Sequence, residues 1–485
     1  MDKAINKKLR NKIFYSNLQW PRFLLNKAFM AHLLLPQIPA SSLPASTPAR
    51  RTPLPTRLSA NPQSSASPSS ILIIGGGLAG LAAATHLHAA KLPFLLLESS
   101  DGLGGRVRTD SVEGFLLDRG FQILLTAYPE ARRLLHFPSL DLRPFYPGAL
   151  VFHSGRLHRV ADPFRRPIDS LLSLPNPIGS VLDKLIVGIH RLRAPTSSPE
   201  TTISHRLRAL GLSPSIIDRF FRPFLAGIFF DPDLSTSSRL FDFIFQCLAA
   251  GDNALPALGI GAIPTQLASN LPSSSIRLQS KVLSIVPGNP PDVNLAGGET
   301  LAANLGVIVA VDQPEALRLL PQIKTASRRP ARRTVCIYFV ADRIPVREPV
   351  LILNGSGEGI VNNMCFPTNV SASYGPAGGS ALVSVSVVGD GGGAGRSDEE
   401  LAAEVVRELG GWFGPEEVSS WKLLRAYRIG FAQPDQSPPT ELTDKDPRVG
   451  DGVYICGDHW SSATFDGALV SGRRAAEALI RDIQV

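Results

Sequence analysis

The stretch that decides the fold runs from Ile71 to Ser99 and reads ILIIGGGLAGLAAATHLHAAKLPFLLLES. Its first four residues, 71–74, form a short apolar run that is typical of a buried strand. The next six residues, 75–80, read GGGLAG and match the G-x-G-x-x-G pattern of a turn that binds a dinucleotide. The sequence therefore predicts a strand, a glycine turn, a helix and a second strand.

Each glycine of the motif has a separate role in such a turn. Gly75 permits the tight bend, Gly77 lets the backbone approach a pyrophosphate, and Gly80 lets the helix pack closely against the strand. The helix begins at about Leu78, so that residue and Ala79 lie in the turn whose free N–H groups and positive dipole end face the phosphates. These five residues form the first part of the predicted cofactor site.

Glu98 follows the second strand, eighteen residues after Gly80. A carboxylate at this place can accept hydrogen bonds from both hydroxyls of an adenosine ribose, and it would repel a 2′-phosphate. NADP is therefore disfavoured, and NAD and FAD stay open. An ordinary tight turn is the alternative for a lone glycine motif, but the strand before it and the acid after it favour the dinucleotide site.

The charge of the chain is concentrated at its N-terminus. Residues 1–70 hold ten Lys and Arg against one acid, whereas the other 415 residues hold 39 basic and 40 acidic side chains. Because that larger part is nearly neutral, its charge does not favour nucleic acid as a partner. The Ser- and Pro-rich tract at 39–70 has no acidic residue, which predicts a transit peptide and a plastid location, with Met1 or Met30 as the start; a disordered tail without an address is the alternative.

The cysteines and the apolar runs narrow the class further. Four cysteines, at positions 247, 336, 365 and 456, form no C-x-x-C pair, which favours core packing in a reducing compartment over disulfides or a metal site. No apolar run reaches the ~18 residues that a spanning helix needs. Metalloprotease, serine-hydrolase and P-loop motifs are lacking, which lowers the hydrolase and kinase interpretations.

Three other segments have two interpretations each. RRPARR at 328–333 lacks interleaved aromatic residues and is predicted to be a solvated loop rather than a nucleic-acid contact. The basic and apolar residues of 162–193 fit either a solvated amphipathic helix or peripheral contact with a membrane surface. Five phenylalanines between 220 and 230 fit either core packing or the lining of a channel for an apolar ligand.

The C-terminal segment 452–480, GVYICGDHWSSATFDGALVSGRRAAEALI, supplies a second half of the site. Its strand ends in Gly457-Asp458, where a bare backbone and a carboxylate can hold a sugar-like chain, and a helix is predicted from Gly467 to about 480. A helix N-terminus stabilises negative charge on a ring. A flavin gains such charge on reduction and a nicotinamide does not, so the segment favours FAD.

Together these motifs resemble the flavin-containing amine oxidase and phytoene desaturase superfamily, over most of the chain from Ile71 to Val485. Besides the two segments quoted above, GLGGRVRTD, GFLLDRG, SKVLSI and VIVAV contribute to the resemblance. The resemblance implies these contacts with FAD: Gly75, Gly77 and Gly80 at the pyrophosphate, Glu98 at the adenosine ribose, Gly104, Gly105 and Arg106 at the diphosphate and ribityl region, the backbone of Val282 at adenine, Asp458 at the phosphate and ribityl part, and Gly467 with Ala468 at the isoalloxazine.

The sequence also departs from the amine oxidases. Many of them carry a lysine near flavin N5 on a strand that corresponds to TVCIYFVA, and this strand has none. The cysteine segment that monoamine oxidases use for covalent attachment is also lacking, so FAD is expected to be noncovalent. His459, after Gly457-Asp458, is the best candidate for an acid or base, although a structural role suits it better.

We therefore expect an FAD-dependent oxidoreductase that removes a hydride from an apolar isoprenoid or tetrapyrrole substrate, with oxygen or a quinone as electron acceptor. A flavin amine oxidase that releases peroxide and a noncatalytic flavoprotein are the alternatives. The expected fold is α/β, with a Rossmann-like FAD-binding domain assembled from 71–150, 251–315 and 441–485. The substrate domain would combine substrate- or membrane-facing helices at 151–250 with a sheet at 316–440.

Overall fold

The computed structural model describes residues 71–192, 199–323, 330–389, 395–440 and 445–484. The chain divides into two units, Met1–Ser64 and Ser65–Val485, and all of these residues belong to the second. The predicted transit peptide lies outside the described residues. The fold is mixed α/β, as expected, and two large sheets with their helices position the site.

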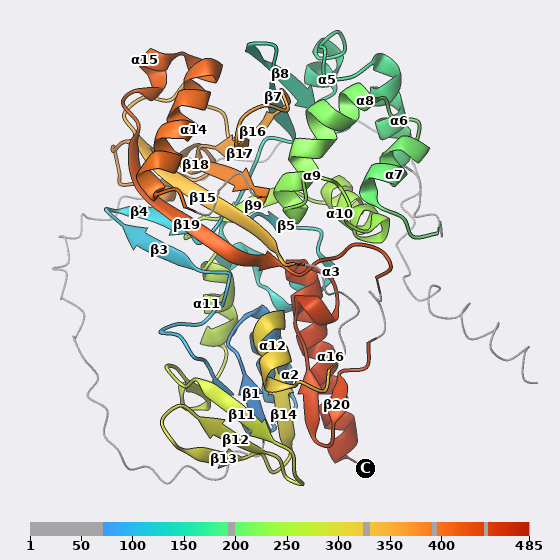
Figure 1. Cartoon of the computed structure of the whole chain (residues 1–485), viewed down its shortest axis with the longest axis vertical. Helices are drawn as coiled ribbons and strands as arrows, with labels where there is room; N and C mark the ends of the chain where they lie inside the picture. The colour runs from blue at the N-terminus through green and yellow to red at the C-terminus, as the bar shows by residue number, and fades with distance from the viewer. Residues whose placement is uncertain (1–70, 193–198, 324–329, 390–394, 441–444, 485) are drawn as a thin grey trace, which may run out of the picture. The chain divides into compact units, whose positions relative to one another are not determined.

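The first sheet has six strands in the order β10-β2-β1-β14-β21-β20 (Figure 1). Its strands are β1 (Ile71–Ile74), β2 (Phe94–Leu97), β10 (Ile276–Arg277), β14 (Gly306–Val309), β20 (Arg448–Gly450) and β21 (Val453–Ile455). All neighbours are parallel except β20 and β21. Ile74 pairs with both Leu97 and Val309, and Val309 pairs with Ile455, so the segments that follow these four strands meet at one edge of the sheet.

Helices α2 (Leu78–Ala89) and α16 (Phe465–Ile483) lie side by side against this sheet (Figure 1). Gly472 of α16 allows their close approach, because it has no side chain. A Cβ at this position would lie 2.0 Å from the Ala79 carbonyl oxygen of α2. The predicted start of the C-terminal helix at Gly467 is wrong by two residues. Thr464 is the N-cap, and its hydroxyl accepts a hydrogen bond from the Gly467 N–H at 2.8 Å, which allows the helix to begin at Phe465.

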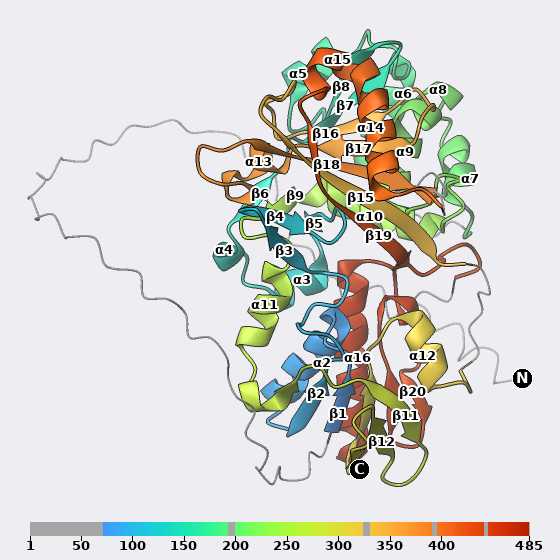
Figure 2. The same cartoon turned by 60° about the vertical axis from the view of Figure 1, so that its left-hand side comes forward.

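The second sheet has seven strands in the order β19-β15-β18-β17-β16-β7-β8. Their bounds are β7 (Gly148–His153), β8 (Arg156–Ala161), β15 (Arg332–Ala341), β16 (Leu351–Asn354), β17 (Val361–Cys365), β18 (Ala381–Val388) and β19 (Lys422–Gln433). The sheet is mixed, because β7 and β16 are parallel and the other neighbours antiparallel. Its apolar face packs against α14 (Asp398–Phe413), which begins with a capping box of Ser397 and Glu400 (Figure 2).

The prediction of a solvated loop at 328–333 is wrong for the last two residues, Arg332 and Arg333, which lie in β15. Residues 328 and 329 lie outside the described residues, but Arg332 begins β15, and its guanidinium pairs with Asp231 at 3.2 Å and with Asp435 at 3.0 Å. Asp231 is fully buried. Arg332 therefore neutralises buried carboxylates instead of facing solvent, a role that the run of like charges in the sequence does not indicate.

A group of helices fills the chain between β8 and β9 (Asn253–Pro256). These are α5 (Pro167–Leu172), α6 (Val181–Leu192), α7 (Ile203–Ala209), α8 (Pro214–Ile216), the π-helical turn η1 (Ile217–Phe221), α9 (Arg222–Phe229) and α10 (Ser238–Ala250). Ser213 caps the N-terminus of α8, and Pro214 is the first residue of that helix. Within the described ranges, no helix is both long and apolar enough to cross a membrane.

The remaining elements are short and connect these parts. They are β3 (Thr109–Val112), β4 (Phe115–Asp118), β5 (Leu124–Leu125), α3 (Pro129–Leu134), α4 (Phe137–Leu140), β6 (Leu142–Pro144), α11 (Ala262–Ser269), η2 (Ser273–Ser275), β11 (Val282–Val286), β12 (Asp292–Leu295), β13 (Thr300–Ala302), α12 (Gln313–Leu319), α13 (Pro367–Val370), η3 (Ala372–Tyr374), α15 (Pro415–Val418) and η5 (Asp458–Trp460). All four cysteines are buried and free, in agreement with the core packing predicted for them.

Candidate active site

One cavity of about 1030 Å³ runs from the glycine turn after β1 to the helices and strands of the second sheet. At one end it is lined by the segments that follow β1, β2, β14 and β21, which is the edge where ligands bind in open parallel sheets. At the other end it is lined by residues of α9, α10, β16 and β19. The two halves of the cavity differ in chemistry, and we call them the dinucleotide end and the apolar chamber.

The glycine turn leaves room for a ligand at one position only. Gly75 has a φ of 105°, and a Cβ on Gly80 would lie 1.9 Å from the Gly75 carbonyl oxygen, so both glycines serve the packing of the turn. Gly77, by contrast, has an ordinary φ of −73°, and a Cβ there would meet no atom within 4 Å. Gly77 lines the cavity together with Leu78 and Ala79, whereas Gly80 is not among the described lining residues.

Glu98 lies at the same end of the cavity, held by the backbone. Its Oε2 accepts a hydrogen bond from the Gly76 N–H at 2.7 Å, and its Oε1 accepts one from the Ser100 N–H at 2.8 Å. Such charge-assisted bonds orient the carboxylate without any ligand. Each carboxylate oxygen has capacity for a further bond, so Glu98 can still accept from a ribose.

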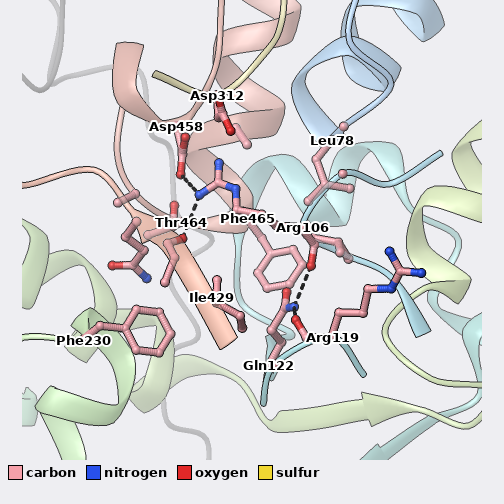
Figure 3. A pocket seen from close by; sticks show the side chains of 18 of the residues that line it. Leu78, Arg106, Arg119, Gln122, Phe230, Asp312, Ile429, Asp458, Thr464 and Phe465 are labelled. Atoms are coloured by element: carbon pink, nitrogen blue, oxygen red, sulfur yellow. Dashed lines mark hydrogen bonds and ion pairs between the residues drawn. The ribbon is translucent and has the colours of Figure 1, made fainter. Parts of the chain in front are cut away.

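Arg106 and Asp458 meet across the middle of the cavity (Figure 3). The Arg106 Nη1 lies 2.8 Å from the Asp458 Oδ2 and also donates to the Ala432 carbonyl at 2.8 Å. Burial raises the pKa of Asp458, but the charge and hydrogen bond of Arg106, together with the neighbouring His459, outweigh that effect and hold the pKa well below its usual range. The other carboxylate oxygen of Asp458 is buried and has no hydrogen-bond partner within the described part of the chain. The nearest charged or polar group that is recorded for this oxygen is the His459 Nδ1, at 3.9 Å.

The other predicted cofactor residues fall into two groups. Gly104, Gly105, Val282, Gly457 and Ala468 line the cavity, whereas Gly467 is not among the described lining residues. A Cβ on Gly467 would lie 2.1 Å from the Ser462 carbonyl oxygen, so this glycine permits the close turn that begins α16. The Val282 carbonyl accepts a hydrogen bond from Arg318, and its hydrogen bond to adenine stays a prediction.

His459 is buried beside the cavity rather than in its described lining. Its Nδ1 lies 3.9 Å from the Asp458 Oδ1, too far for a hydrogen bond, and neither ring nitrogen has a partner in the ranges described. Because the side chain does not reach the cavity, the geometry gives His459 no direct role as acid or base.

The apolar chamber contains the residues that the sequence left unassigned. Aromatic and aliphatic side chains dominate it: Phe121, Phe145, Phe224, Ile228, Phe230 and Ile244 all line its walls. The predicted phenylalanine cluster is divided, because Phe224 and Phe230 line the cavity, whereas Phe221 and Phe229 are buried in the core. Both interpretations of the cluster therefore apply, each to different residues.

A few polar side chains also line the chamber, and the sequence analysis missed them. Thr334 comes from β15, Asn363 from β17 and Tyr427 from β19, and Gln122 donates to the Arg106 carbonyl at 2.9 Å. Figure 3 shows Phe230 and Ile429 on the chamber side of the Arg106–Asp458 pair. Alternation along these strands could have marked the inward-facing residues, but no local motif indicated that three distant strands share one cavity.

The dinucleotide end fits a ligand with a pyrophosphate and an adjoining sugar-like chain. Gly77 leaves open space before the first N–H groups of α2, where a phosphate is stabilised. The carboxylates of Glu98 and Asp458 belong to residues that line this end, and α16 presents a second N-terminus at the cavity through Thr464 and Ala468. The donor and acceptor set agrees with the group that the sequence predicts.

Comparison with known proteins places these features in context. A family model described as flavin-containing amine oxidoreductase matches residues 78–480. Hydroxysqualene dehydroxylase of Sinorhizobium fredii is 25% identical over 453 residues, covering 86% of this chain and 99% of the relative. Coproporphyrinogen III oxidase of Propionibacterium freudenreichii is 29% identical over 191 residues, covering 37% of this chain and 35% of the relative.

Solved structures share the fold. Cyclohexylamine oxidase from Brevibacterium oxydans superposes with a TM-score of 0.61 at 18% identity, over 86% of this chain and all of that one (100%). At this identity the likeness concerns the fold alone.

Proposed function

Because this chain belongs to the flavin-containing amine oxidoreductase family and is therefore a flavin oxidoreductase, we propose that it removes a hydride from an apolar isoprenoid or tetrapyrrole substrate. The observation that carries the proposal is the continuity of one cavity from the glycine turn to the apolar chamber. A substrate in the chamber would lie next to whatever occupies the dinucleotide end. The alternative of a noncatalytic flavoprotein is set aside, because the family consists of oxidoreductases.

The proposed cofactor is noncovalent FAD, held in a Rossmann-like domain formed by 71–150, 251–315 and 441–485. When bound, FAD would supply the acceptor for the hydride. Gly77 would admit the pyrophosphate, Glu98 would hold the ribose, and Arg106 with Asp458 would hold the diphosphate and ribityl region. Noncovalent binding is supported by the cysteines, since none of the four, all within the described ranges, lines the cavity.

The substrate class is proposed from the chamber and from two relatives. Aromatic and aliphatic walls exclude water and bind an apolar molecule by burial, while Thr334 and Asn363 can orient a polar end through hydrogen bonds. The names of the two relatives, hydroxysqualene dehydroxylase and coproporphyrinogen III oxidase, support an isoprenoid or a tetrapyrrole. Oxygen or a quinone is proposed as final acceptor. The plastid location, peripheral membrane contact and substrate domain of 151–250 and 316–440 are also proposals from the sequence.

Amine oxidation is the second candidate, because amine oxidases share the family and the fold. The side chain that β15 presents to the cavity is Thr334, however, and not a lysine. The described lining includes one lysine, Lys281, and it lies at the dinucleotide end beside Val282. The chamber thus provides no ammonium group near the predicted reaction site.

Anaerobic reduction of the bound flavin tests the proposal. The full chain, loaded with FAD, is mixed with members of three classes: plastid isoprenoids, porphyrinogens and amines. Loss of the oxidised flavin absorbance with an isoprenoid or a porphyrinogen is the expected result. Loss with amines alone, together with peroxide on admission of air, would establish the second candidate instead.

A further inference from the structure

The exposed apolar side chains of this protein are gathered in one short region. Of the twelve large hydrophobic side chains that are exposed in the described residues, eight lie between positions 164 and 189. They are Phe164, Ile168, Leu171, Leu172, Val181, Leu182, Leu185 and Ile189, with exposed fractions from 49% to 73%. We call this set the apolar face. Large apolar patches on a protein surface mark interaction sites, so the gathering of these side chains calls for a partner.

The apolar face is formed by two helices held together. In α5 the exposed residues Ile168, Leu171 and Leu172 have the i, i+3, i+4 spacing of one helix side, and no residue of this helix is buried. The ammonium of Lys184 in α6 donates to the Ser173 carbonyl at 2.8 Å and to the Leu174 carbonyl at 2.9 Å, just after α5 ends. These bonds place the first turns of α6 beside the end of α5.

Helix α6 is amphipathic, and its outward side belongs to the apolar face. Leu182, Leu185 and Ile189 are exposed at i, i+3 and i+7, whereas Ile186 and Val187 pack against the core. The outward leucines and isoleucine therefore have no packing role within the described residues. Burial against the core explains why α6 forms but not why its solvent side is apolar.

Basic residues accompany the apolar face. The described stretch 156–191 holds six Lys and Arg against three Asp. Three of the cations are neutralised, because Arg159, Arg165 and Arg191 pair with carboxylates. Arg166, the N-cap of α5, and Lys184 in α6 make no ion pair within the described residues, so two positive charges on these helices, the basic surround of the face, are available to an anionic partner. Apolar side chains within a basic surround are typical of helices that lie in the headgroup layer of an anionic membrane.

The apolar face also adjoins the catalytic cavity. Tyr146 lines the cavity, its hydroxyl donates to Asp169 of α5 at 2.6 Å, and the Arg166 guanidinium lies 5.3 Å from its ring centre. A second hollow of about 680 Å³ shares Tyr146 and Phe145 with the cavity and includes Arg166 and Asp169. Phe145 and Tyr146 thus line both the cavity and the hollow at the base of α5.

We propose that the apolar face docks on an anionic lipid membrane, with α5 and α6 lying in the headgroup layer and the Tyr146 side of the cavity turned toward the lipid. Lipid is favoured over a second copy of the chain because the basic surround would repel itself across a symmetric dimer, whereas it attracts anionic headgroups. The docking depends on the surface alone. Passage of an apolar substrate past Tyr146 rests on the proposed function.

Vesicle binding without substrate tests the docking, so that its failure is distinct from failure of the proposed reaction. The full chain with FAD is sedimented with vesicles of phosphatidylcholine containing about one third phosphatidylglycerol. The double variant L171D/L172D is expected to bind at least tenfold more weakly, because it places two charges in the embedded helix. L258D is the matched control: Leu258 is 70% exposed but lies outside the apolar face, and its variant is expected to bind like the wild type.

A second measurement does not depend on the folding of the aspartate variants. A bimane label on L172C is expected to be quenched by spin-labelled lipid, whereas the same label on L258C is not; the native cysteines are buried. Equal vesicle binding by wild type and L171D/L172D, or equal quenching at both labels, would overturn the proposal. A wild-type dimer without lipid that L171D/L172D dissociates would assign the apolar face to a second copy instead.

Discussion

Substitution of Gly77 by alanine separates cofactor binding from folding. The φ of −73° at Gly77 suits any L-residue, and the added Cβ would meet no protein atom within 4 Å. The free energy of unfolding of the cofactor-free protein should therefore change by less than about 0.5 kcal/mol. The methyl group would instead occupy the space through which a pyrophosphate reaches the N–H groups of α2.

The expected loss of affinity follows from those N–H groups. A hydrogen bond to a charged group contributes about 1.5–3 kcal/mol, so displacing the phosphate from one such donor should raise the Kd for FAD roughly 10- to 200-fold. Titration of the cofactor-free protein with FAD, followed by flavin fluorescence, measures this change. Urea unfolding of the same preparation measures stability.

Two other glycines serve as references. G297A should leave both quantities unchanged, because a Cβ on Gly297 also meets no atom within 4 Å and this residue does not line the cavity as far as it is described. G80A should destabilise the cofactor-free protein, because its Cβ would lie 1.9 Å from the Gly75 carbonyl oxygen. Wild-type FAD affinity in G77A would refute the position assigned to the pyrophosphate. A loss of stability in G77A equal to that in G80A would refute the claim that the space beside Gly77 is open.

Three further outcomes are expected. D458N should weaken FAD binding and lower the free energy of unfolding by about 1–3 kcal/mol, because Arg106 loses its partner at 2.8 Å; unchanged FAD titration and urea unfolding would contradict this. T464A should cost about 1 kcal/mol in the same unfolding assay, because α16 loses its N-cap, whereas T464S keeps the hydroxyl and should cost less; equal stability of T464A and the wild type would contradict the cap. Burial raises the pKa of Asp118 to about 6. The protonated carboxyl therefore contributes its full stabilisation below the unfolded pKa of about 4, and this contribution is lost as the pH rises through 6. Between pH 5 and pH 8 the free energy of unfolding of the wild type should fall by about 1.4 kcal/mol more than that of D118N; an equal fall in both proteins would show that Asp118 is already charged at pH 5.

The dinucleotide end could be predicted because its signals are local. The glycine turn needs residue types at fixed offsets, so GGGLAG between an apolar run and a helix specified the first parallel strand, α2 and the open position at Gly77. The C-terminal motif worked in the same way. The predicted helix start at Gly467 is two residues late, because the Thr464 hydroxyl accepts from the Gly467 N–H and caps a helix that begins at Phe465.

The pairing of Arg106 with Asp458 could not be derived from the sequence. The two residues are 352 positions apart and meet only because β21 joins the sheet beside β14, after β1 and β14 have paired. Each was assigned to the same region of FAD from its own motif. Nothing local to either residue indicated that they would neutralise each other before a ligand arrives.

The lining of the apolar chamber could not be predicted from the sequence for a similar reason. Phe224, Phe230 and Ile429 come from segments that pack through contacts between distant strands and helices. Apolar periodicity marks a residue as facing inward, and an inward-facing residue can line either a core or a cavity. The division of the phenylalanine cluster between the two is a property of the assembled fold.

The central claim is that the reaction takes place in the apolar chamber beside the dinucleotide end. Ile228→Trp would fill part of the chamber far from Gly77, and Leu258→Trp adds the same ring at an exposed position outside it. The rate of anaerobic flavin reduction, by the isoprenoid or porphyrinogen that reduces the wild type, tests the claim most directly. We expect at least a tenfold fall in Ile228→Trp with unchanged FAD affinity and no fall in Leu258→Trp. An unchanged rate in Ile228→Trp would contradict the claim, because the substrate would then react elsewhere.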